Sequence, residues 1–337
     1  MKSKPSIKDI ANMVGVSTAT ISRYLNGKYQ SMSEETRQRI AAAIERMGYQ
    51  PSNIARSLRS TKSKTIAVLM ADIFNPYSMD VLRGIEQQCS EHGYTIFICD
   101  AKDSAQRERN LIEEMTAKGV DGFIINTTGE NNNFIKGLSL DYPVVLIGRK
   151  INGAAINTVA VDNQQGIDLA MKHLQQKGCR AITFLTPAPG NISPRIERIA
   201  TFNQIAASEA FREITCHCLE MAALESNALQ DRLRRQLDTR PQERQALITA
   251  NGKLTLHVIA ALNALHLTPP HDVLLVGFDD TDWAPLIRQP LTVIAQPTYE
   301  IGLTAARKLI LMLDGQKTRK ETATTLLPLS LIARETT

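Results

Sequence analysis

Apolar residues near the N-terminus recur three and four positions apart, the spacing of a helix that buries one face. They are Ile7, Ile10, Ala11 and Val14. Gly15 is expected to end this helix, and Ser17 is a suitable N-cap for a second helix that stops at the Asn-Gly pair 26–27. A third helix is predicted from Ser33 to Gly48, with acidic residues in its first turn. The first fifty residues therefore predict three short helices around one small core.

The second predicted helix has an outer face of small and polar side chains: Thr18, Ala19, Ser22 and Arg23. Two short helices joined by a tight turn, the second with such a face, are typical of a helix-turn-helix DNA reader. Small residues let the helix enter the major groove, where the Arg23 guanidinium can donate two hydrogen bonds to a guanine edge. The alternative is an ordinary three-helix bundle whose polar face only meets water.

After Lys64 the pattern changes to short apolar runs separated by helical stretches. The runs predicted as buried parallel strands are Thr65–Met70, Tyr94–Cys99, Gly122–Ile125, Val144–Ile147, Ala181–Leu185, Ala246–Ala250 and Val273–Val276. The helices predicted between them include Tyr77–His92, Gln106–Lys118 and Asn163–Lys177. A spacing of about thirty residues is that of βαβ units in a doubly wound sheet.

These units are too many for one sheet, so we expect two similar lobes. The chain is predicted to cross from one lobe to the other near Val159–Asn163. Two such lobes, with their strand ends facing each other, form a cleft that is the usual ligand site of this architecture.

Charge is distributed unevenly along the 337 residues. Residues 1–62 contain eleven Lys or Arg against four Asp or Glu, whereas the remainder contains 28 basic and 30 acidic residues. A basic head on a nearly neutral body indicates that the head binds a polyanion, the alternative being a merely solvated terminus. No apolar run of about 18 residues and no secretory signal occur, so we expect a cytoplasmic protein. The five scattered cysteines are expected to be reduced, and we expect no metal and no cofactor.

The run SIKDIANMVGVSTATISRYLNG, followed by SEETRQRIAAAIERMGYQPSNIARSLRS, closely resembles the DNA-binding headpiece of the lactose-repressor (LacI/GalR) family. The match covers residues 6–60 and continues past Pro51. In that family the tail is a hinge helix that folds on the operator and inserts a leucine into the minor groove, which implies this role for Leu58. Such a short segment is marginal as an isolated helix. The expected DNA-binding residues are Ser17, Thr18, Ala19, Thr20, Ser22, Arg23, Asn26, Asn53, Ala55, Arg56 and Leu58.

The resemblance extends more loosely along the body, which is similar to a periplasmic sugar-binding protein. Polar residues that match pocket positions of relatives are Tyr77, Ser78, Asn126, Arg149, Asp162, Arg198, Asn251, Asp279 and Gln296. Asp279 has the chemistry to accept hydrogen bonds from hydroxyls, and the arginines are fork-shaped donors for an anion. Structural alternatives remain open for three of them: Asp279 as a turn cap, Asn126 as a strand-end residue and Arg149 as a surface arginine.

Two departures from the family pattern concern acidic residues. Gly148 stands where many relatives have Asp, and Gly252 replaces the Asp that commonly follows Asn251. The missing carboxylate beside Arg149 favours an anionic ligand over a neutral sugar. The segment GFDDTDWAPLIRQPLT, which includes Trp283, also resembles the corresponding segment of family members that sense sugar acids such as ketogluconates.

Two rival functions fit the sequence less well. An exported binding protein would explain the body, but it would explain neither the basic head nor the lack of a signal sequence. A doubly wound enzyme is disfavoured because the sequence contains no dinucleotide fingerprint after the first strand, no P-loop and no nucleophile elbow. The carboxylates at Asp279, Asp280 and Asp282 have no His or Lys at a spacing suited to acid–base chemistry, so no catalytic residue is expected.

The predicted fold is an α-helical helix-turn-helix headpiece plus an α/β two-lobed, periplasmic-binding-protein-like (type I) sensor domain. The expected domains are a headpiece at 1–50, a hinge at 51–63 and a sensor at 64–337. Lobe 1 is expected to comprise about 64–161 and 296–322, and lobe 2 about 162–295 and 323–337.

The expected function is that of a transcription regulator, a repressor, controlled by a small sugar or sugar-acid effector. Two heads that read a near-palindromic double-stranded operator imply a homodimer. The helices near Tyr77–Gln88 and Gly252–Leu265 are candidates for its interface. The chain has no C-terminal leucine heptads, which favours a dimer over a tetramer.

Overall fold

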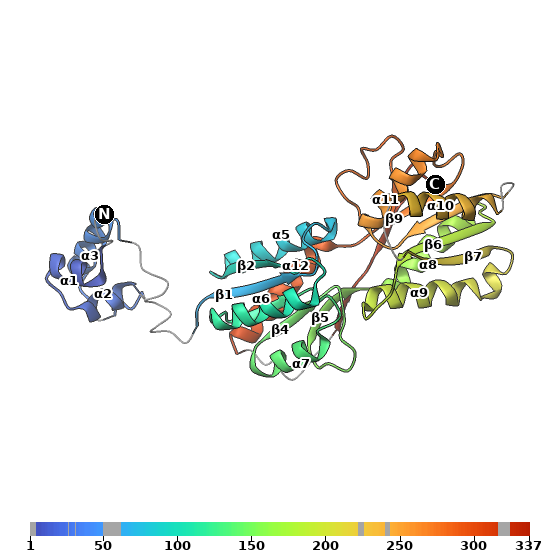
Figure 1. Ribbon diagram of the computed structural model, residues 1–337. Helices are drawn as coiled ribbons and strands as arrows, with labels where there is room; N and C mark the ends of the chain where they lie inside the picture. Colours follow the sequence, from blue (N-terminus) through green and yellow to red (C-terminus); the bar gives the residue numbers. More distant parts are fainter. Residues whose placement is uncertain are drawn as a thin grey trace. The chain divides into compact units, whose positions relative to one another are not determined.

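The computed structural model describes residues 5–25, 27–30, 32–49, 62–221, 226–239, 243–315 and 324–337. The chain divides into two compact units, Met1–Ser63 and Lys64–Thr337. The first is helical, and the second contains two six-stranded sheets (Figure 1). Within the described ranges, no helix combines the length and the apolarity needed to cross a membrane.

The described residues of the first unit form the helices α1 (Ile7–Val14), α2 (Thr18–Leu25) and α3 (Glu34–Met47). Serine hydroxyls cap the last two, because Ser17 Oγ accepts from Thr20 N at 3.1 Å and Ser33 Oγ accepts from Thr36 N at 3.2 Å. Gly15 and Gly48 end α1 and α3 in the left-handed conformation. The three predicted helices and their caps are therefore confirmed. Their shared core is Ile10, Ala11, Val14, Ile21, Ile40 and Ala43.

The first lobe of the second unit is built on a sheet with the strand order β11-β5-β4-β3-β1-β2. Its strands are β1 (Thr65–Met70), β2 (Thr95–Asp100), β3 (Gly122–Ile125), β4 (Val144–Ile147), β5 (Asn157–Val161) and β11 (Thr324–Leu327), and all neighbours pair in parallel. Helices α5 (Pro76–Glu91) and α12 (Thr298–Leu313) bury their apolar sides with one face of this sheet. Helices α6 (Ala105–Ala117) and α7 (Asn132–Asp141) bury theirs with the other face.

The second lobe has a sheet with the order β12-β10-β9-β8-β6-β7. Its strands are β6 (Ala181–Pro187), β7 (Thr215–Met221), β8 (Gln245–Thr249), β9 (Leu274–Phe278), β10 (Thr292–Ala295) and β12 (Ser330–Ile332). Only β12 runs antiparallel to its neighbour in this described sheet. Helices α8 (Asn163–Gln176) and α9 (Ser193–Ala206) pack on one face, and α10 (Ser226–Asp238) and α11 (Gly252–Ala264) pack on the other. A 3₁₀ turn, η1 (Glu209–Phe211), follows α9.

The chain passes between the lobes after β5, after β10 and after β11. The first passage, at Asp162, falls inside the segment predicted for it. The expected boundary at 322/323 is wrong, however, because β11 pairs in parallel with β5 and belongs to lobe 1. Only from β12, which pairs with β10, does the C-terminal segment belong to lobe 2. These strands are too short for their apolar pattern to identify a pairing partner.

Helix α5 is held tightly against α12 by two glycines. A Cβ on Gly84 would overlap the main chain at Tyr299, and a Cβ on Gly302 would overlap the main chain at Val81. The two helix backbones can approach this closely only because both positions lack a side chain. This packing fixes α5, whose first turn carries Tyr77.

Candidate functional site

One pocket of the second unit collects side chains from the carboxyl edges of both sheets. It is lined by seven of the predicted effector residues: Tyr77, Asn126, Arg149, Arg198, Asn251, Asp279 and Gln296. Five of them stand one or two positions after a strand, as Asn126 follows β3, Asn251 follows β8 and Asp279 follows β9. Parallel strands deliver their ends to one edge, so residues far apart in sequence meet there. The topology therefore explains why strand-end residues converge on this pocket.

Arg198, on α9, is the most enclosed cation of the pocket. It is 5% exposed, donates from Nε to Asn163 Oδ1 at 2.8 Å and donates from Nη1 to the Ala250 carbonyl. Its Cζ lies 3.9 Å from the centre of the Phe278 ring. Burial lowers the pKa of Arg198 to about 10, and the charge of Asp279 opposes this shift. The guanidinium thus remains positive at neutral pH and is locked in orientation.

Asp279 supplies the one carboxylate among the residues that line the pocket. Its backbone has a φ of 72°, in the left-handed region that Asp tolerates better than most residues. Oδ2 accepts from Gly252 N at 3.0 Å, and Oδ1 accepts from Gln296 Nε2 at 2.5 Å. A Cβ on Gly252 would lie 3.3 Å from Oδ2, so an acidic residue there would place a second carboxylate beside the first.

Tyr77 presents an unpaired hydroxyl to the pocket. Its hydroxyl oxygen is buried and has no hydrogen-bond partner among the described residues. Burial raises the pKa of Tyr77, and the negative charge of Asp279 adds to the shift, so the phenol stays protonated and can donate. Gly148 makes room for this group, because a Cβ there would lie 2.7 Å from the Tyr77 oxygen and 3.3 Å from Asn126 Nδ2. A side chain at 148 would therefore require the end of Tyr77 to move, and the φ of 67° independently favours glycine there.

Arg149 follows β4 and donates from Nη1 to the Thr127 carbonyl. The loop that carries Thr127 is fastened by Glu108, a fully buried carboxylate on α6. Glu108 accepts from Thr128 N at 2.8 Å, from Thr128 Oγ1 at 2.7 Å and from Asn131 Nδ2 at 2.8 Å. Burial lowers the pKa of Arg149, and the positive charge of Arg195 lowers it further. Asn126 beside it donates to the Ile147 carbonyl at 2.9 Å.

Two predicted effector residues do not line the pocket. The Ser78 hydroxyl donates to the Asp72 carbonyl at 2.7 Å, and Asp162 Oδ1 accepts from Gln165 N at 3.0 Å as the N-cap of α8. Both side chains are thus engaged in local structure. The sequence analysis missed Arg195 on α9, which does line the pocket and donates to the Ala188 carbonyl at 2.9 Å. Only its place in the first turn of α9, which follows β6 along the chain, could have suggested it.

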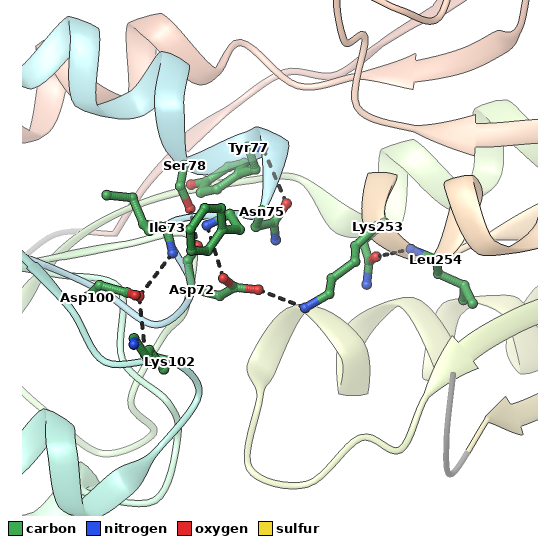
Figure 2. A network of polar contacts seen from close by, with 11 residues as sticks. Asp72, Ile73, Asn75, Tyr77, Ser78, Asp100, Lys102, Lys253 and Leu254 are labelled. Atoms are coloured by element: carbon green, nitrogen blue, oxygen red, sulfur yellow. Dashed lines mark hydrogen bonds and ion pairs between the residues drawn. The ribbon is translucent and has the colours of Figure 1, made fainter. Parts of the chain in front are cut away.

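Ion pairs join the two lobes on either side of the pocket. Lys253, on α11 of lobe 2, extends toward Asp72, which follows β1 of lobe 1 (Figure 2), and the Nζ–Oδ2 distance is 2.9 Å. Asp72 also accepts from Phe74 N, and its carbonyl accepts from Ser78, so it organises the turn that leads into α5. A second pair joins Lys150 Nζ to Glu197 Oε1 at 2.7 Å. None of these pairs was anticipated from the sequence.

In the first unit, α2 presents the predicted DNA-contacting face. Thr18, Ala19 and Arg23 are exposed, whereas Ser22 is half-buried. The hydroxyls of Ser17 and Thr20 lie 3.0 Å apart and take part in the cap of α2. The remaining predicted contacts, Asn26, Asn53, Ala55, Arg56 and Leu58, lie outside the described residues.

Comparison with known proteins decides the family. Residues 6–52 match the family of bacterial regulatory proteins named lacI, and residues 171–337 match a periplasmic binding protein-like domain. Over 318 residues the chain is 34% identical to the HTH-type transcriptional regulator KdgR of Bacillus subtilis, with 94% of each chain covered. The chain belongs to the lacI family. It is also 35% identical over 315 residues to the HTH-type transcriptional regulator PtxS of Pseudomonas putida, covering 93% of this chain and 91% of that one.

The fold agrees with this membership. The lac repressor dimer bound to operator and the anti-inducer ONPF superimposes with a TM-score of 0.85 at 22% identity, covering 99% of each chain. At this identity the likeness concerns the fold alone. As a lacI-family member, the chain is a DNA-binding transcription regulator and not an enzyme, so the predicted family, fold class and regulator function are confirmed. Within the described ranges, no cluster of three or more His, Cys, Asp or Glu could hold a metal ion.

Proposed function

We propose that this lacI-family protein is an operator-binding repressor that releases DNA when a small sugar acid occupies the pocket between its lobes. The observation that carries the effector class is the charge of the pocket lining. Arg149, Arg195 and Arg198 face one carboxylate, that of Asp279. A ligand carboxylate would compensate this excess of positive charge, whereas a neutral sugar would leave it uncompensated in a partly desolvated site.

The remaining polar groups suit the hydroxyls of such a ligand. Gln296 donates a hydrogen bond to Asp279, and the pair offers a ligand both an acceptor and a donor. The Tyr77 hydroxyl is a further donor and has no partner among the described residues. Buried polar groups are normally hydrogen-bonded, so a ligand oxygen near Tyr77 would satisfy a group that the described residues do not. Gly252 supports the acid preference, because an Asp at this position would neutralise part of the positive charge.

The DNA-binding part of the proposal rests on the exposed face of α2. Thr18, Ala19 and Arg23 would meet base edges, and two copies of the head would read the halves of a near-palindromic operator. The two helices suggested as the dimer interface each expose a large apolar side chain, Met79 on α5 (55%) and Leu256 on α11 (43%). A second copy of the chain would cover them. The place of action would be the cytoplasm, where operator DNA lies.

The proposal is tested by thermal unfolding of the full chain with a panel of acids and their neutral counterparts. The pairs are D-gluconate with D-glucitol, D-glucuronate with D-glucose, and D-galacturonate with D-galactose. An acid present at 100 times its dissociation constant stabilises the folded state by about 2.7 kcal/mol, which raises the melting temperature measurably. We expect a shift with at least one acid and a much smaller shift with its neutral partner. Equal shifts within every pair, or no shift with any acid, would eliminate the sugar-acid assignment.

A further inference from the structure

Two arginines from opposite lobes line the same pocket. Arg149 follows β4 in lobe 1, and Arg195 lies in the first turn of α9 in lobe 2. Each donates from Nη1 to a main-chain carbonyl of its own lobe, Arg149 to Thr127 and Arg195 to Ala188. A guanidinium has five N–H donors, so each keeps donors for a ligand after this anchoring bond.

Neither arginine forms an ion pair with any described carboxylate; the ion pairs of this region belong to their neighbours. Burial lowers the pKa of both guanidinium groups, and the charge of Arg195 contributes to the shift of Arg149. Asp103 is the acid whose charge favours both cations, but it is absent from the pocket lining. The two positive charges therefore share one partly desolvated region in which neither forms an ion pair with a described carboxylate, although the charge of Asp103 acts on both.

The segments that carry the two arginines are held close by direct contacts. Lys150 N donates to Ser193 Oγ at 2.7 Å, and Lys150 Nζ lies 2.7 Å from Glu197 Oε1. Ser193 and Glu197 flank Arg195 on α9, and Lys150 follows Arg149. The two guanidinium groups thus reach the pocket from segments that contact each other across the lobe boundary.

We propose that Arg149 and Arg195 together form a clamp for the anionic group of the effector, with one jaw on each lobe, and that Arg195 is a specificity-determining residue. This inference rests on the proposed function, since it requires a ligand with an acid group. The ligand would lie with its carboxylate between the two arginines and its hydroxyls toward Asp279 and Gln296. The anion would replace repulsion between the jaws by attraction, so acid recognition and the approach of the lobes would be one event.

Isothermal titration calorimetry of the full chain tests the clamp with the same pairs of acids and neutral sugars. The variants are Arg195→Gln, Arg149→Gln and, as a matched control, Arg212→Gln, which removes an exposed lobe 2 arginine paired with Glu209. A charged hydrogen bond removed from either jaw should lower the affinity for the bound acid about 10- to 100-fold. Affinity for the neutral partner should change less than about twofold, and Arg212→Gln should match wild type. Arg195→Lys, which keeps the charge, should recover part of the acid preference.

The double variant Arg149→Gln/Arg195→Gln separates a shared clamp from two independent contacts. If both arginines hold one carboxylate, the product of the two fold-losses in acid affinity of the single variants should exceed the fold-loss of the double variant. Fully multiplicative losses would overturn the shared clamp. An unchanged acid preference in Arg195→Gln, with the preference lost in Arg149→Gln, would overturn the role of Arg195 and leave the proposed function standing. A wild-type protein that binds none of the acids would overturn both.

Discussion

Replacing Gly148 with Ala places a methyl group against the end of the Tyr77 side chain, which must move to admit it. Gly148 has a φ of 67°, and the new Cβ would lie 2.7 Å from the Tyr77 hydroxyl oxygen and 3.3 Å from the Asn126 amide nitrogen. Gly153, in the same loop between β4 and β5, also has a φ of 67°, but a Cβ there would have no neighbour within 4 Å. Gly153→Ala is thus a matched control that shares the left-handed backbone strain, about 1–2 kcal/mol, without the overlap.

The difference in stability between Gly148→Ala and Gly153→Ala measures the cost of the steric overlap alone. Overpacking of a closely packed site destabilises by about 1–3 kcal/mol, so Gly148→Ala should be less stable than Gly153→Ala by that amount. For a unit of this size each kcal/mol lowers the melting temperature by about 2 °C, which gives an expected difference of about 2–6 °C. Tyr77→Phe removes the nearest oxygen and should recover most of this difference when combined with Gly148→Ala.

Scanning calorimetry of the full chain measures these melting temperatures, and titration with D-gluconate measures the pocket. Gly148→Ala should weaken ligand binding because it displaces Tyr77 and Asn126, whereas Gly153→Ala should leave binding unchanged. If the two alanine variants melt together, or if Tyr77→Phe gives no recovery, the contact of Gly148 with Tyr77 is not what requires glycine. The absence of an acidic side chain at 148 would then need another explanation.

Three further predictions concern other parts of the chain. Glu108→Ala leaves the two buried donors of Thr128 unpaired and should destabilise by about 2 kcal/mol or more, whereas Glu113→Ala on the same helix, exposed and paired with Arg109, should have little effect in the same thermal assay. A double-mutant cycle with Asp72→Asn and Lys253→Met should give a coupling of about 0.2–1 kcal/mol that falls with added salt, because the lysine side chain is 47% exposed; coupling that persists in high salt contradicts this. Arg23→Ala should weaken binding to the cognate operator by about 1–3 kcal/mol and relax preference at one base pair, and equal weakening on all operator variants would indicate a phosphate contact.

The sequence predicted most of the strands that are continuous apolar runs, but it did not predict the fully buried strand β5, whose Asn157 and Thr158 interrupt the apolar pattern. Runs such as Val144–Ile147 are fully buried strands, and their pattern of β-branched residues identifies them without tertiary information. The edge strand β7 was missed because its side chains alternate between partly buried and exposed positions. Strands β10 to β12 were missed, although β3 and β4 are as short, because each of the three contains Thr or Ser that interrupts the apolar run. Their place in a sheet depends on pairing, which no local pattern contains.

The candidate site was predictable to the extent that it consists of strand ends. Asn126, Asn251 and Asp279 each stand just after a predicted strand, so topology alone brings them together. Asp162 also directly follows a strand and Ser78 lies in the first turn of α5, but both side chains bond locally, which the sequence does not reveal. Arg195 escaped notice because a helical position gives no sign of which way a long side chain extends.

The contacts between the lobes explain how the charge of a ligand could control their approach. Asp72 with Lys253, and Glu197 with Lys150, are complementary pairs that attract whether or not a ligand is present. Arg149 and Arg195, one on each lobe, repel each other and so oppose the attraction of these two ion pairs. In the proposed clamp, a ligand anion turns this repulsion into attraction and leaves the two ion pairs unchanged. A ligand can shift the equilibrium between two arrangements by no more than its difference in affinity for them. In the proposed clamp that difference comes mainly from the carboxylate, since it binds a positive charge on each lobe. A neutral sugar that bound the Asp279 side would therefore occupy the pocket without producing the response, and would act as a competitor of the acid and not as a weak substitute for it.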